Sequence, residues 1–274
     1  MAALIACDLD RTLIYSDRFF NGGNPHPRTC VEYYDGSPLS FMTPLAAERL
    51  RALAARGPVV PATTRTVAQY CRLELPGRPF RYAVTSNGGN ILVDSVPDAD
   101  WSAAMAARIR DGGAPLADIL AALQAHISEH WVLNLRVAED LFCYLVVIEN
   151  QLPAGFFDEW TEWCAGRGWR VSRQGRKIYT VPDGLCKSRA VAEVRRRLIE
   201  DGALAGQAPL LAAGDGVLDA ELLNYADASM RPAHGELHAL GWRCERTAVT
   251  RSSGAQAAEE ILSWLAERAS APLV

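Results

Sequence analysis

The sequence predicts an α/β protein with a parallel sheet as its core and a separate α+β unit inserted into the chain. Three observations lead to this fold class. Short apolar runs, such as residues 4–7 and 209–213, alternate with helical stretches towards both ends of the chain, as in parallel sheets. Between about residues 94 and 183, helices and paired strand-like runs replace that alternation. At 274 residues, the chain is near the length at which one core divides into two.

The segment before residue 94 opens with an apolar strand, LIAC, at residues 4–7. A stretch rich in glycine, proline, asparagine and aromatic residues follows at 17–42, which indicates a flap or hairpin. Thr43 and Pro44 are typical of a helix N-terminus, because threonine caps a helix and proline fits its first turn. We expect this helix to end at Gly57. Three strands should follow at 58–62, 82–85 and 90–93. A helix to about residue 73 is expected after the first strand, and a turn at 87–89 between the second and the third.

The middle segment has a different texture, with helices and hairpin-like strand pairs. We expect helices at 98–110, 115–129 and 154–167, and strands at 131–137, 141–148, 169–172 and 177–181. Four tryptophans of this segment are expected to form its core: Trp131, Trp160, Trp163 and Trp169. The sequence therefore predicts an α+β domain at 94–183, between core segments at 1–93 and 184–274.

After residue 184 the alternation of helices and strands resumes. A helix is expected at 187–201, a strand at 209–213, a tight turn at 214–216 and a second helix at 218–225. The last elements are strands at 226–230 and 247–250 and a helix from about Ala255. Alternation on both sides of the insertion predicts a Rossmann-like parallel sheet.

Composition excludes several classes of function. The net charge of −4 provides no electrostatic footprint for nucleic acid or an anionic membrane, and the run Arg195–Arg197 lies on an amphipathic helical pattern. Seven cysteines without a CxxC pair argue against a disulfide framework or a zinc ribbon. The N-terminus has no long apolar stretch, and no segment has the ~18 apolar residues of a membrane-spanning helix. A cytoplasmic protein that binds neither nucleic acid nor membrane is expected.

Two pairs of aspartates follow apolar strands. Asp8 and Asp10 come after the strand at 4–7, and Asp215 and Asp219 come after the strand at 209–213. Ligands of open α/β sheets bind at the carboxyl ends of the strands, where these pairs should meet. Like charges 4 Å apart repel by roughly 1–4 kcal/mol at effective dielectric constants of 80 down to 20. Four converging carboxylates therefore call for a cation, and a site made of oxygen ligands favours Mg²⁺.

Two further polar residues stand at positions suited to an anion. Thr63 follows the strand at 58–62, where its hydroxyl and neighbouring amides can hold a phosphate oxygen, or where it can simply cap a helix. Lys187 opens a helix, although the helix dipole disfavours a cation there. This placement suggests an anionic partner, while a surface lysine is the ordinary alternative.

The order of these motifs resembles the haloacid dehalogenase superfamily of phosphotransferases. The motifs are DLDRT (8–12), VVPATTR (59–65), Lys187 and GDGVLD (214–219). Their spacing is similar to that of the branch with a large α+β cap between the second and third motifs. SNGGN (86–90) also resembles a segment of that branch, which contains sugar-phosphate phosphatases such as sucrose-phosphate phosphatase.

The resemblance implies roles for individual residues. Asp8 matches the nucleophile that forms an aspartyl phosphate and also binds Mg²⁺. Asp10 matches the general acid and base, and its backbone carbonyl is the group that ligates the metal. Asp215 matches a metal ligand, and Asp219 would support the metal or orient Lys187. Phosphate and substrate binding are assigned to Thr63, Arg65, Asn87, Gly88 and Lys187.

Three positions depart from the family pattern. Arg11 stands where glycine is frequent, Gly216 replaces a frequent serine, and Leu218 occupies a position often taken by asparagine. The last change concerns the surroundings of Lys187, but none of the carboxylates is lost.

The expected activity is hydrolysis of a small phosphorylated metabolite, similar to a sugar phosphate. A sugar phosphomutase is the main alternative, since a phosphate clamp could be built from Arg136, Arg170, Arg173 and Arg176. A catalytically silent metabolite sensor is a third possibility, against which the complete motif set argues. His126, Glu129 and His130 match an HxxEH zinc pattern, which we interpret as a surface feature. His234 and His238 are expected to be exposed.

Overall fold

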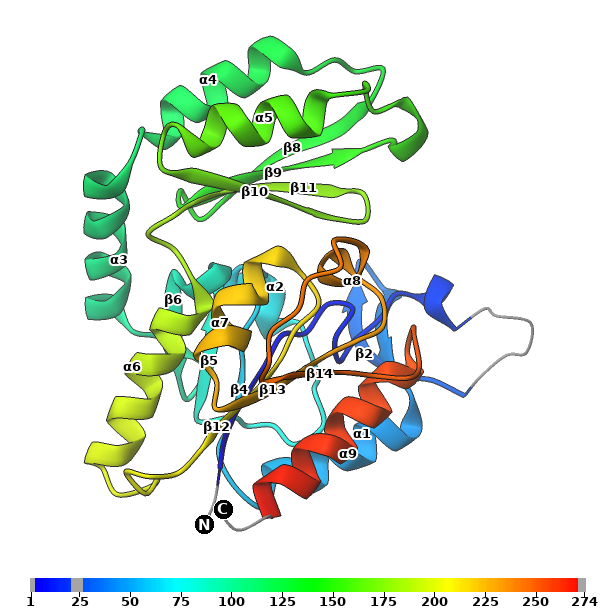
Figure 1. Cartoon of the computed structure of the whole chain (residues 1–274), viewed down its shortest axis with the longest axis vertical. Helices are drawn as coiled ribbons and strands as arrows, with labels where there is room; N and C mark the ends of the chain where they lie inside the picture. Colours follow the sequence, from blue (N-terminus) through cyan, green and yellow to red (C-terminus); the bar gives the residue numbers. More distant parts are fainter. Residues whose placement is uncertain (1–2, 21–26, 271–274) are drawn as a thin grey trace. The chain divides into compact units, whose positions relative to one another are not determined.

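The computed structural model describes residues 3–20 and 27–270. The chain divides into two compact units, one formed by Met1–Asp98 with Lys187–Val274 and one by Ala99–Cys186 (Figure 1). We call the first the core unit and the second the inserted unit. The division falls a few residues after the expected limits at 93/94 and 183/184. The strand β7 (Val96–Pro97) still pairs with the core strand β6 (Asn90–Val93), and Arg170 of the inserted unit donates to Leu185 O at 2.8 Å.

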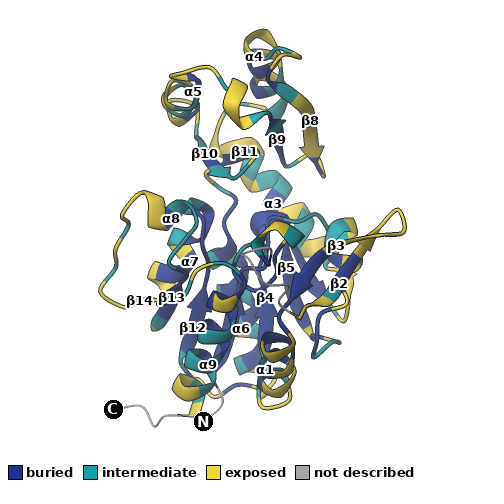
Figure 2. Cartoon of the chain, turned by 90° about the vertical axis from the view of Figure 1, so that its right-hand side faces the viewer, coloured by how far each residue is buried: buried dark blue, intermediate teal, exposed yellow. Residues whose placement is uncertain are grey.

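The core unit is built on a five-stranded parallel sheet, which confirms the predicted fold class. Its strand order is β14-β13-β12-β1-β4, and every neighbouring pair is parallel. The strands are β1 (Leu4–Cys7), β4 (Val59–Pro61), β12 (Leu210–Ala213), β13 (Ala228–Arg231) and β14 (Thr247–Val249). Every residue of β1, β4 and β12 is buried, as expected for apolar strands covered on both faces (Figure 2).

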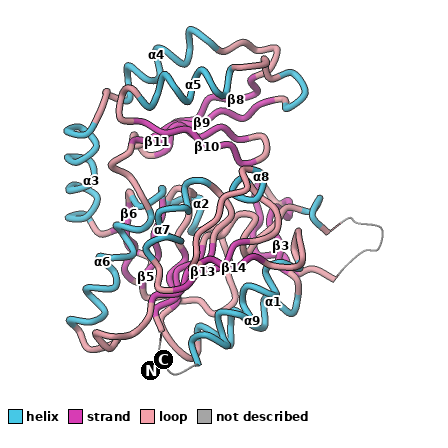
Figure 3. The backbone as a smooth tube through the Cα atoms, viewed as in Figure 1, coloured by secondary structure: helices cyan, strands magenta, loops and turns pink. Residues whose placement is uncertain are grey.

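Helices cover both faces of this sheet (Figure 3). Ile5, Cys7 and Leu211 belong to one apolar cluster with buried residues of α1 (Pro44–Ala54) and α9 (Gln256–Ser270). The alternate residues of β1 are also fully buried, and α6 (Lys187–Glu200) and α7 (Ala220–Tyr225) lie on that other side. This alternation of buried faces leaves the carboxyl ends of the strands as the place for polar side chains.

An antiparallel hairpin lies beside the sheet, as predicted for the segment 17–42. Its strands are β2 (Thr29–Tyr34) and β3 (Ser37–Met42), preceded by a 3₁₀ turn at Asp17–Phe19. Residues 21–26 of that segment lie outside the described residues. An isolated bridge between Tyr15 and Phe41 ties the hairpin to the chain that follows β1.

The remaining core elements form a small antiparallel sheet in the order β5-β6-β7, with β5 at Tyr82–Thr85. A parallel bridge between Ala62 and Val84 connects it to the chain after β4. The helix expected after β4 is α2 (Val67–Cys71), and Thr66 caps it rather than Thr63. The Thr66 hydroxyl accepts from the Gln69 N–H and the Gln69 side chain accepts from the Thr66 N–H, so both form a capping box.

The inserted unit is an antiparallel sheet with helices. Its sheet order is β10-β11-β9-β8. Its elements are α3 (Ala99–Gly112), α4 (Leu116–His126), β8 (Val132–Ala138), β9 (Phe142–Val147), α5 (Phe156–Ala165), β10 (Trp169–Gln174) and β11 (Lys177–Pro182). Trp131, Trp160 and Trp169 are buried, and the half-buried Trp163 stacks on Trp160 with ring centroids 4.9 Å apart.

Several element ends differ from the sequence-based expectation. α4 stops at His126 because Ile127 adopts an extended conformation, so His126, Glu129 and His130 do not share a helix, and all three are exposed. α1 ends at Ala54, before Gly57, and the short helix α8 (Glu236–Ala239) was not expected. Within the described ranges, every helix is too short or too polar to cross a membrane.

Candidate active site

Asp8 lies directly after β1, at the carboxyl edge of the parallel sheet. Its backbone N–H donates to Ala213 O at 2.9 Å, which continues the pairing of β1 with β12. The buried carboxylate accepts hydrogen bonds from the Thr12 hydroxyl at 3.0 Å and from Lys187 Nζ at 2.6 Å. Burial raises the pKa of the Asp8 carboxyl to about 7; Lys187 opposes this rise, while Asp219 and Asp10 add to it. Because burial disfavours the charged carboxylate, Asp8 needs a nearby positive charge to stay ionised.

Lys187 is the first residue of α6 and is buried with an exposure of 1 %. Its Nζ donates to Asp8 Oδ1 and to Asp219 Oδ1, both at 2.6 Å. Burial lowers the pKa of the amine, but the charges of Asp219 and Asp8 outweigh burial and hold the pKa above its ordinary value. Lys187 is thus a charged group in a fixed position, not a surface lysine.

Asp219 closes the loop that follows β12. Its Oδ2 accepts the backbone N–H groups of Asp215 at 3.1 Å and Gly216 at 2.9 Å, while Oδ1 accepts from Lys187. The loop requires a glycine at position 214, because a Cβ there would lie 2.5 Å from Cβ of Asp219. These hydrogen bonds hold the Asp219 carboxylate against the Lys187 amine. The sequence left two roles open for Asp219, supporting the metal or orienting Lys187, and this arrangement favours the second.

Asp215 differs from its neighbours because both of its buried carboxylate oxygens have no hydrogen-bond partner among the described residues. Its ion pair with Arg11 is long, at 3.6 Å between Oδ2 and Nε. Burial raises the pKa of Asp215 well above its ordinary value, and Asp8 and Asp219 raise it further. A buried carboxylate without hydrogen bonds is costly unless a cation joins it.

The arrangement fits a divalent cation. Asp8, Asp215 and Asp219 each offer a carboxylate oxygen within 4.8 Å of the others, and all three residues are buried. Oxygen ligands of this kind suit Mg²⁺, and such an ion would provide the partner that the Asp215 oxygens lack. Asp219 accepts three hydrogen bonds, two of them from backbone N–H groups of its own loop, whereas Asp8 accepts two and Asp215 none among the described residues, so Asp215 and Asp8 have more capacity left for an ion.

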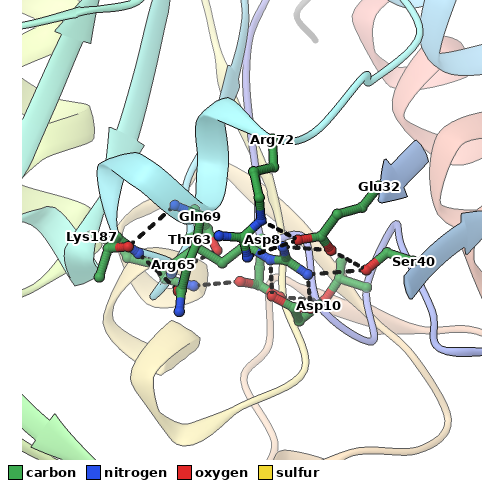
Figure 4. A network of polar contacts seen from close by, with 11 residues as sticks. Asp8, Asp10, Glu32, Ser40, Thr63, Arg65, Gln69, Arg72 and Lys187 are labelled. Atoms are coloured by element: carbon green, nitrogen blue, oxygen red, sulfur yellow. Dashed lines mark hydrogen bonds and ion pairs between the residues drawn. The ribbon is translucent and has the colours of Figure 1, made fainter. Parts of the chain in front are cut away.

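Asp10 is the exception to the predicted convergence of four carboxylates. Its carboxylate is not part of the acidic cluster; Arg65 Nε donates to Oδ2 at 2.7 Å and Arg65 Nη2 donates to Oδ1 at 2.8 Å (Figure 4). The bidentate contact with a guanidinium turns the side chain towards the loop after β4. The carboxylate of Asp10 is therefore not placed with the candidate metal ligands, and metal binding by its backbone carbonyl stays a prediction.

Two loops that the sequence assigned to substrate binding are joined by backbone hydrogen bonds. Thr63 is fully buried, and its hydroxyl accepts from the Arg65 N–H at 3.1 Å. The Asn87 N–H donates to Thr63 O at 2.9 Å, and the Ser86 N–H donates to Arg65 O at 2.7 Å. The turn at Ser86–Gly88 has positive φ at all three residues, including Asn87 at 55° and Gly88 at 99°. The turn therefore supports the 63–65 loop beside the carboxyl edge of the sheet.

Arg65 was assigned to substrate binding, but its guanidinium is occupied by protein carboxylates. Besides Asp10, it pairs with Glu32 of β2, with Nη1 2.9 Å from Oε2. Sequence reasoning missed Glu32, Ser40 and Arg72 of this network, because an alternating strand pattern does not show which polar residue faces inwards. The one available signal was an acidic residue between Val31 and the aromatic pair Tyr33–Tyr34 in a strand-like run.

Arg11 occupies a position with φ of 64°, a left-handed conformation that favours glycine. Arg11 therefore holds a backbone conformation that is more strained for an arginine than for a glycine. His234 Nε2 lies 2.8 Å from Arg11 O, while His234 Nδ1 accepts from the Gly254 N–H at 3.1 Å. His234 is therefore half-buried, contrary to the expectation that it is exposed, whereas His238 is exposed.

Comparison with known proteins gave matches in structure only. No protein-family model and no curated protein sequence matches the chain. Among solved structures, the sucrose-phosphatase of Synechocystis sp. PCC6803, determined with sucrose and phosphate, superposes with a TM-score of 0.64 at 17% identity. That match covers 97% of this chain and 98% of the other.

Two further structures are similar over the same extent. Thermoplasma acidophilum 0175 has a TM-score of 0.60 at 15% identity, covering 97% of this chain and 99% of the other. A subclass IIB sugar phosphatase of the haloacid dehalogenase superfamily has a TM-score of 0.51 at 13% identity, covering 97% and 98%. Because these matches extend over both units, the chain has the fold of the haloacid dehalogenase superfamily, in the form with a large α+β insertion.

Proposed function

We propose that this chain is a Mg²⁺-dependent phosphatase that hydrolyses a small phosphorylated metabolite, of the sugar phosphate type, through an aspartyl phosphate on Asp8. The observation that carries the proposal is the buried group of Asp8, Lys187 and Asp215 at the carboxyl edge of the sheet. It holds a nucleophilic carboxylate beside a fixed positive charge and an unsatisfied acidic ligand. The fold is also that of structures named as sucrose-phosphatase and sugar phosphatase.

In the first half of the reaction, an oxygen of Asp8 attacks the phosphorus atom of the ester. The bond between phosphorus and the leaving-group oxygen breaks, and Asp10 donates a proton to that oxygen. Lys187 neutralises charge on the transferring phosphoryl group, and Thr63 with the neighbouring amides binds its oxygens. A Mg²⁺ ion held by Asp8 and Asp215 would supply further neutralisation of phosphate charge.

In the second half, water attacks the phosphorus atom of the aspartyl phosphate. Asp10, now ionised, accepts a proton from that water, and the bond between phosphorus and the Asp8 oxygen breaks. Inorganic phosphate leaves, and both aspartates return to their starting states. The chain thus needs one carboxylate that attacks and a second that exchanges protons with solvent, which agrees with Asp8 being buried and Asp10 only partly so.

The inserted unit is proposed to act as a cap domain that selects the leaving group. Arg136 of β8, Tyr144 of β9 and Tyr179 of β11 are aligned across the sheet by its register and so share one face. The two tyrosine rings lie 5.3 Å apart, and Lys177 Nζ lies 5.6 Å from the Tyr144 ring centroid. Aromatic rings beside cationic groups suit a sugar ring that carries polar or anionic substituents.

A screen for phosphate release tests the proposal. The purified protein would be assayed with Mg²⁺ on a panel of sugar phosphates, nucleotides and phosphoglycolate, with Asp8→Asn as the control for contaminating phosphatases. We expect free phosphate from at least one small ester with the wild type and none with the variant. Conversion to an isomeric sugar phosphate would indicate a phosphomutase instead. Binding of sugar phosphates without turnover would indicate a sensor. A cytoplasmic location stays a prediction.

A further inference from the structure

Glu32 is a carboxylate that the hairpin places in the interior of the core unit. It lies on β2, and its side chain has an exposure of 0%. Burying a carboxylate is unfavourable unless cations and hydrogen-bond donors surround it. Glu32 has three such partners: Oε2 accepts from Ser40 Oγ at 2.6 Å and pairs with Arg65 Nη1 at 2.9 Å, and Oε1 accepts from Arg72 Nη2 at 3.1 Å.

Arg65 connects Glu32 to the active site. Its Nε and Nη2 form the two-pronged contact with the Asp10 carboxylate, while Nη1 reaches Glu32 and Nη2 also lies 3.2 Å from Ser40 Oγ (Figure 4). A guanidinium is planar, so a contact that fixes Nη1 also fixes the direction of the other donors. The contact with Glu32 therefore fixes the plane of the Arg65 guanidinium and the direction of the two nitrogen donors that bind Asp10.

The other cation on Glu32 provides an internal comparison. Arg72 contacts Oε1 of Glu32 through Nε at 3.3 Å and Nη2 at 3.1 Å, whereas Arg65 pairs with Oε2. Its guanidinium also lies over the ring of Tyr34, 4.9 Å from the centroid. Arg72 thus contributes to the burial of Glu32, whereas Arg65 transmits the position of Glu32 to Asp10.

We propose that Glu32 is a positioning residue for Asp10 and acts through Arg65, so that the β2–β3 hairpin sets the orientation of the proton-transferring carboxylate. This inference rests on the proposed function of Asp10. If Glu32 only attached the hairpin to the core, it would not need Arg65, because Arg72 and Ser40 already provide it with a cation and a hydrogen-bond donor. The shared Arg65 is what distinguishes a positioning role from a purely structural one.

The test compares leaving groups. In Glu32→Gln, which keeps the shape of the side chain but removes its charge, kcat/KM for an alkyl phosphate should fall about 10- to 100-fold, because displacement of a catalytic group by about 1 Å costs up to ~10²-fold. For p-nitrophenyl phosphate, whose leaving group needs no proton, the loss should be no more than about threefold. Arg65→Lys should show the same pattern, since an ammonium cannot bind both Asp10 oxygens and Glu32 together.

Two controls separate this effect from misfolding. Arg72→Gln removes a cation from the same buried carboxylate but leaves Arg65 in place. The ratio of kcat/KM for the alkyl phosphate to kcat/KM for p-nitrophenyl phosphate should therefore stay that of the wild type. In an Asp10→Asn background, Glu32→Gln should cause little further loss, because the two residues act in series. Equal losses on both substrates, or additive losses in the double variant, would overturn the inference.

A crystal structure of Glu32→Gln gives a readout that is independent of activity. The Asp10 carboxylate should leave its two-pronged contact with Arg65 or occupy several orientations. If Asp10 keeps the wild-type contact in that crystal, Glu32 has no positioning role. Absence of phosphate release by the wild-type protein would instead contradict the proposed function, and the crystal would still decide the position of Asp10.

Discussion

The carboxyl edge of the core sheet and one face of the inserted sheet, the face with Arg136, Tyr144 and Tyr179, differ in how far their polar side chains are buried and paired. At the core edge, Asp8, Lys187 and Asp219 are buried and joined by hydrogen bonds of 2.6 Å, so each charge has a fixed position. On the inserted sheet, Arg136 is exposed and Tyr144 is half-buried, and their neighbours are aromatic rings. The side chains at the core edge thus have few alternative arrangements, whereas those on the sheet face have more freedom.

This difference agrees with the division that we propose, with the chemistry at the core edge and the selectivity on the sheet face. Phosphoryl transfer depends on positioned charges in a site that excludes water, and their strength increases with burial. Recognition of a leaving group requires contacts that can vary between related proteins without disturbing the fold. Substitutions at the core edge should therefore affect all substrates, and substitutions on the sheet face should change their ranking. The following predictions test this division.

The largest effect is expected from Asp8→Asn. An amide cannot replace the attacking carboxylate, so steady-state phosphate release should fall about 10⁴-fold or more for every substrate. Rapid-quench experiments with ³²P-labelled substrate should show a phosphoenzyme in the wild type and none in the variant. A labelled protein in Asp8→Asn would place the nucleophile elsewhere.

Removal of divalent metal should also affect all substrates. Phosphate release should disappear after exhaustive EDTA treatment and return with Mg²⁺, but not with Ca²⁺, whose larger and looser coordination misplaces the nucleophile. Mg²⁺ should also raise the Tm of the wild type, because it binds the folded carboxylates, and this increase should be smaller in Asp215→Asn. Full activity in EDTA would contradict the metal site.

Asp10→Asn should impair the reaction according to the leaving group. For alkyl phosphates the loss should be about 10²–10⁴-fold, the usual contribution of general acid and base catalysis. With p-nitrophenyl phosphate the loss should be smaller, because the departing nitrophenolate needs no proton. Measurement of kcat/KM over a series of leaving-group pKa values checks this, and a uniform loss would remove Asp10 from the acid role.

Lys187→Met should destabilise the folded protein as well as inactivate it. The variant leaves the Asp8 and Asp219 carboxylates buried without their cation, and breaking a buried ion pair in this way costs about 3–5 kcal/mol of unfolding free energy. Urea denaturation measures the loss. Arg196→Gln, which removes exposed ion pairs with Glu193 and Glu200 from the same helix, is the matched control and should change the free energy of unfolding far less.

The sequence predicted the fold class and the convergence of Asp8, Asp215 and Asp219, because each pair of aspartates follows an apolar strand whose place in a parallel sheet is determined by topology, while Lys187 was assigned to the site by the family resemblance. It did not predict the turn of Asp10 towards Arg65, because these two residues are 55 positions apart along the chain. Pairings of this kind are decided by side-chain packing in three dimensions, which no local pattern records.

Strand alternation also separates arginines that sequence alone treats as equivalent. Arg136 is paired with Tyr144 and lies on the tyrosine face, whereas Arg173 is paired with Ile178 and lies on the opposite face. That opposite face is the one on which α5 packs, as Trp160 Nε1 donates to Thr180 Oγ1 at 2.9 Å. Arg170 donates to the backbone of the inserted unit at Leu185 O. Of these three, Arg136 is the best candidate for contact with substrate.

The smallest effect is expected from Arg136→Ala, compared with Arg173→Ala. This comparison tests most directly whether the core edge carries the chemistry and the sheet face the selectivity. Arg136→Ala should change kcat/KM for the preferred substrate relative to its competitors by about 3- to 10-fold, the size of one lost polar contact. Arg173→Ala should leave the ranking of substrates unchanged, because its side chain is on the helix-covered face. Both variants should hydrolyse p-nitrophenyl phosphate nearly as well as the wild type, since the core edge is intact. If Arg136→Ala and Tyr179→Phe both leave the ranking unchanged, selectivity must instead reside in the 29–42 hairpin of the core unit.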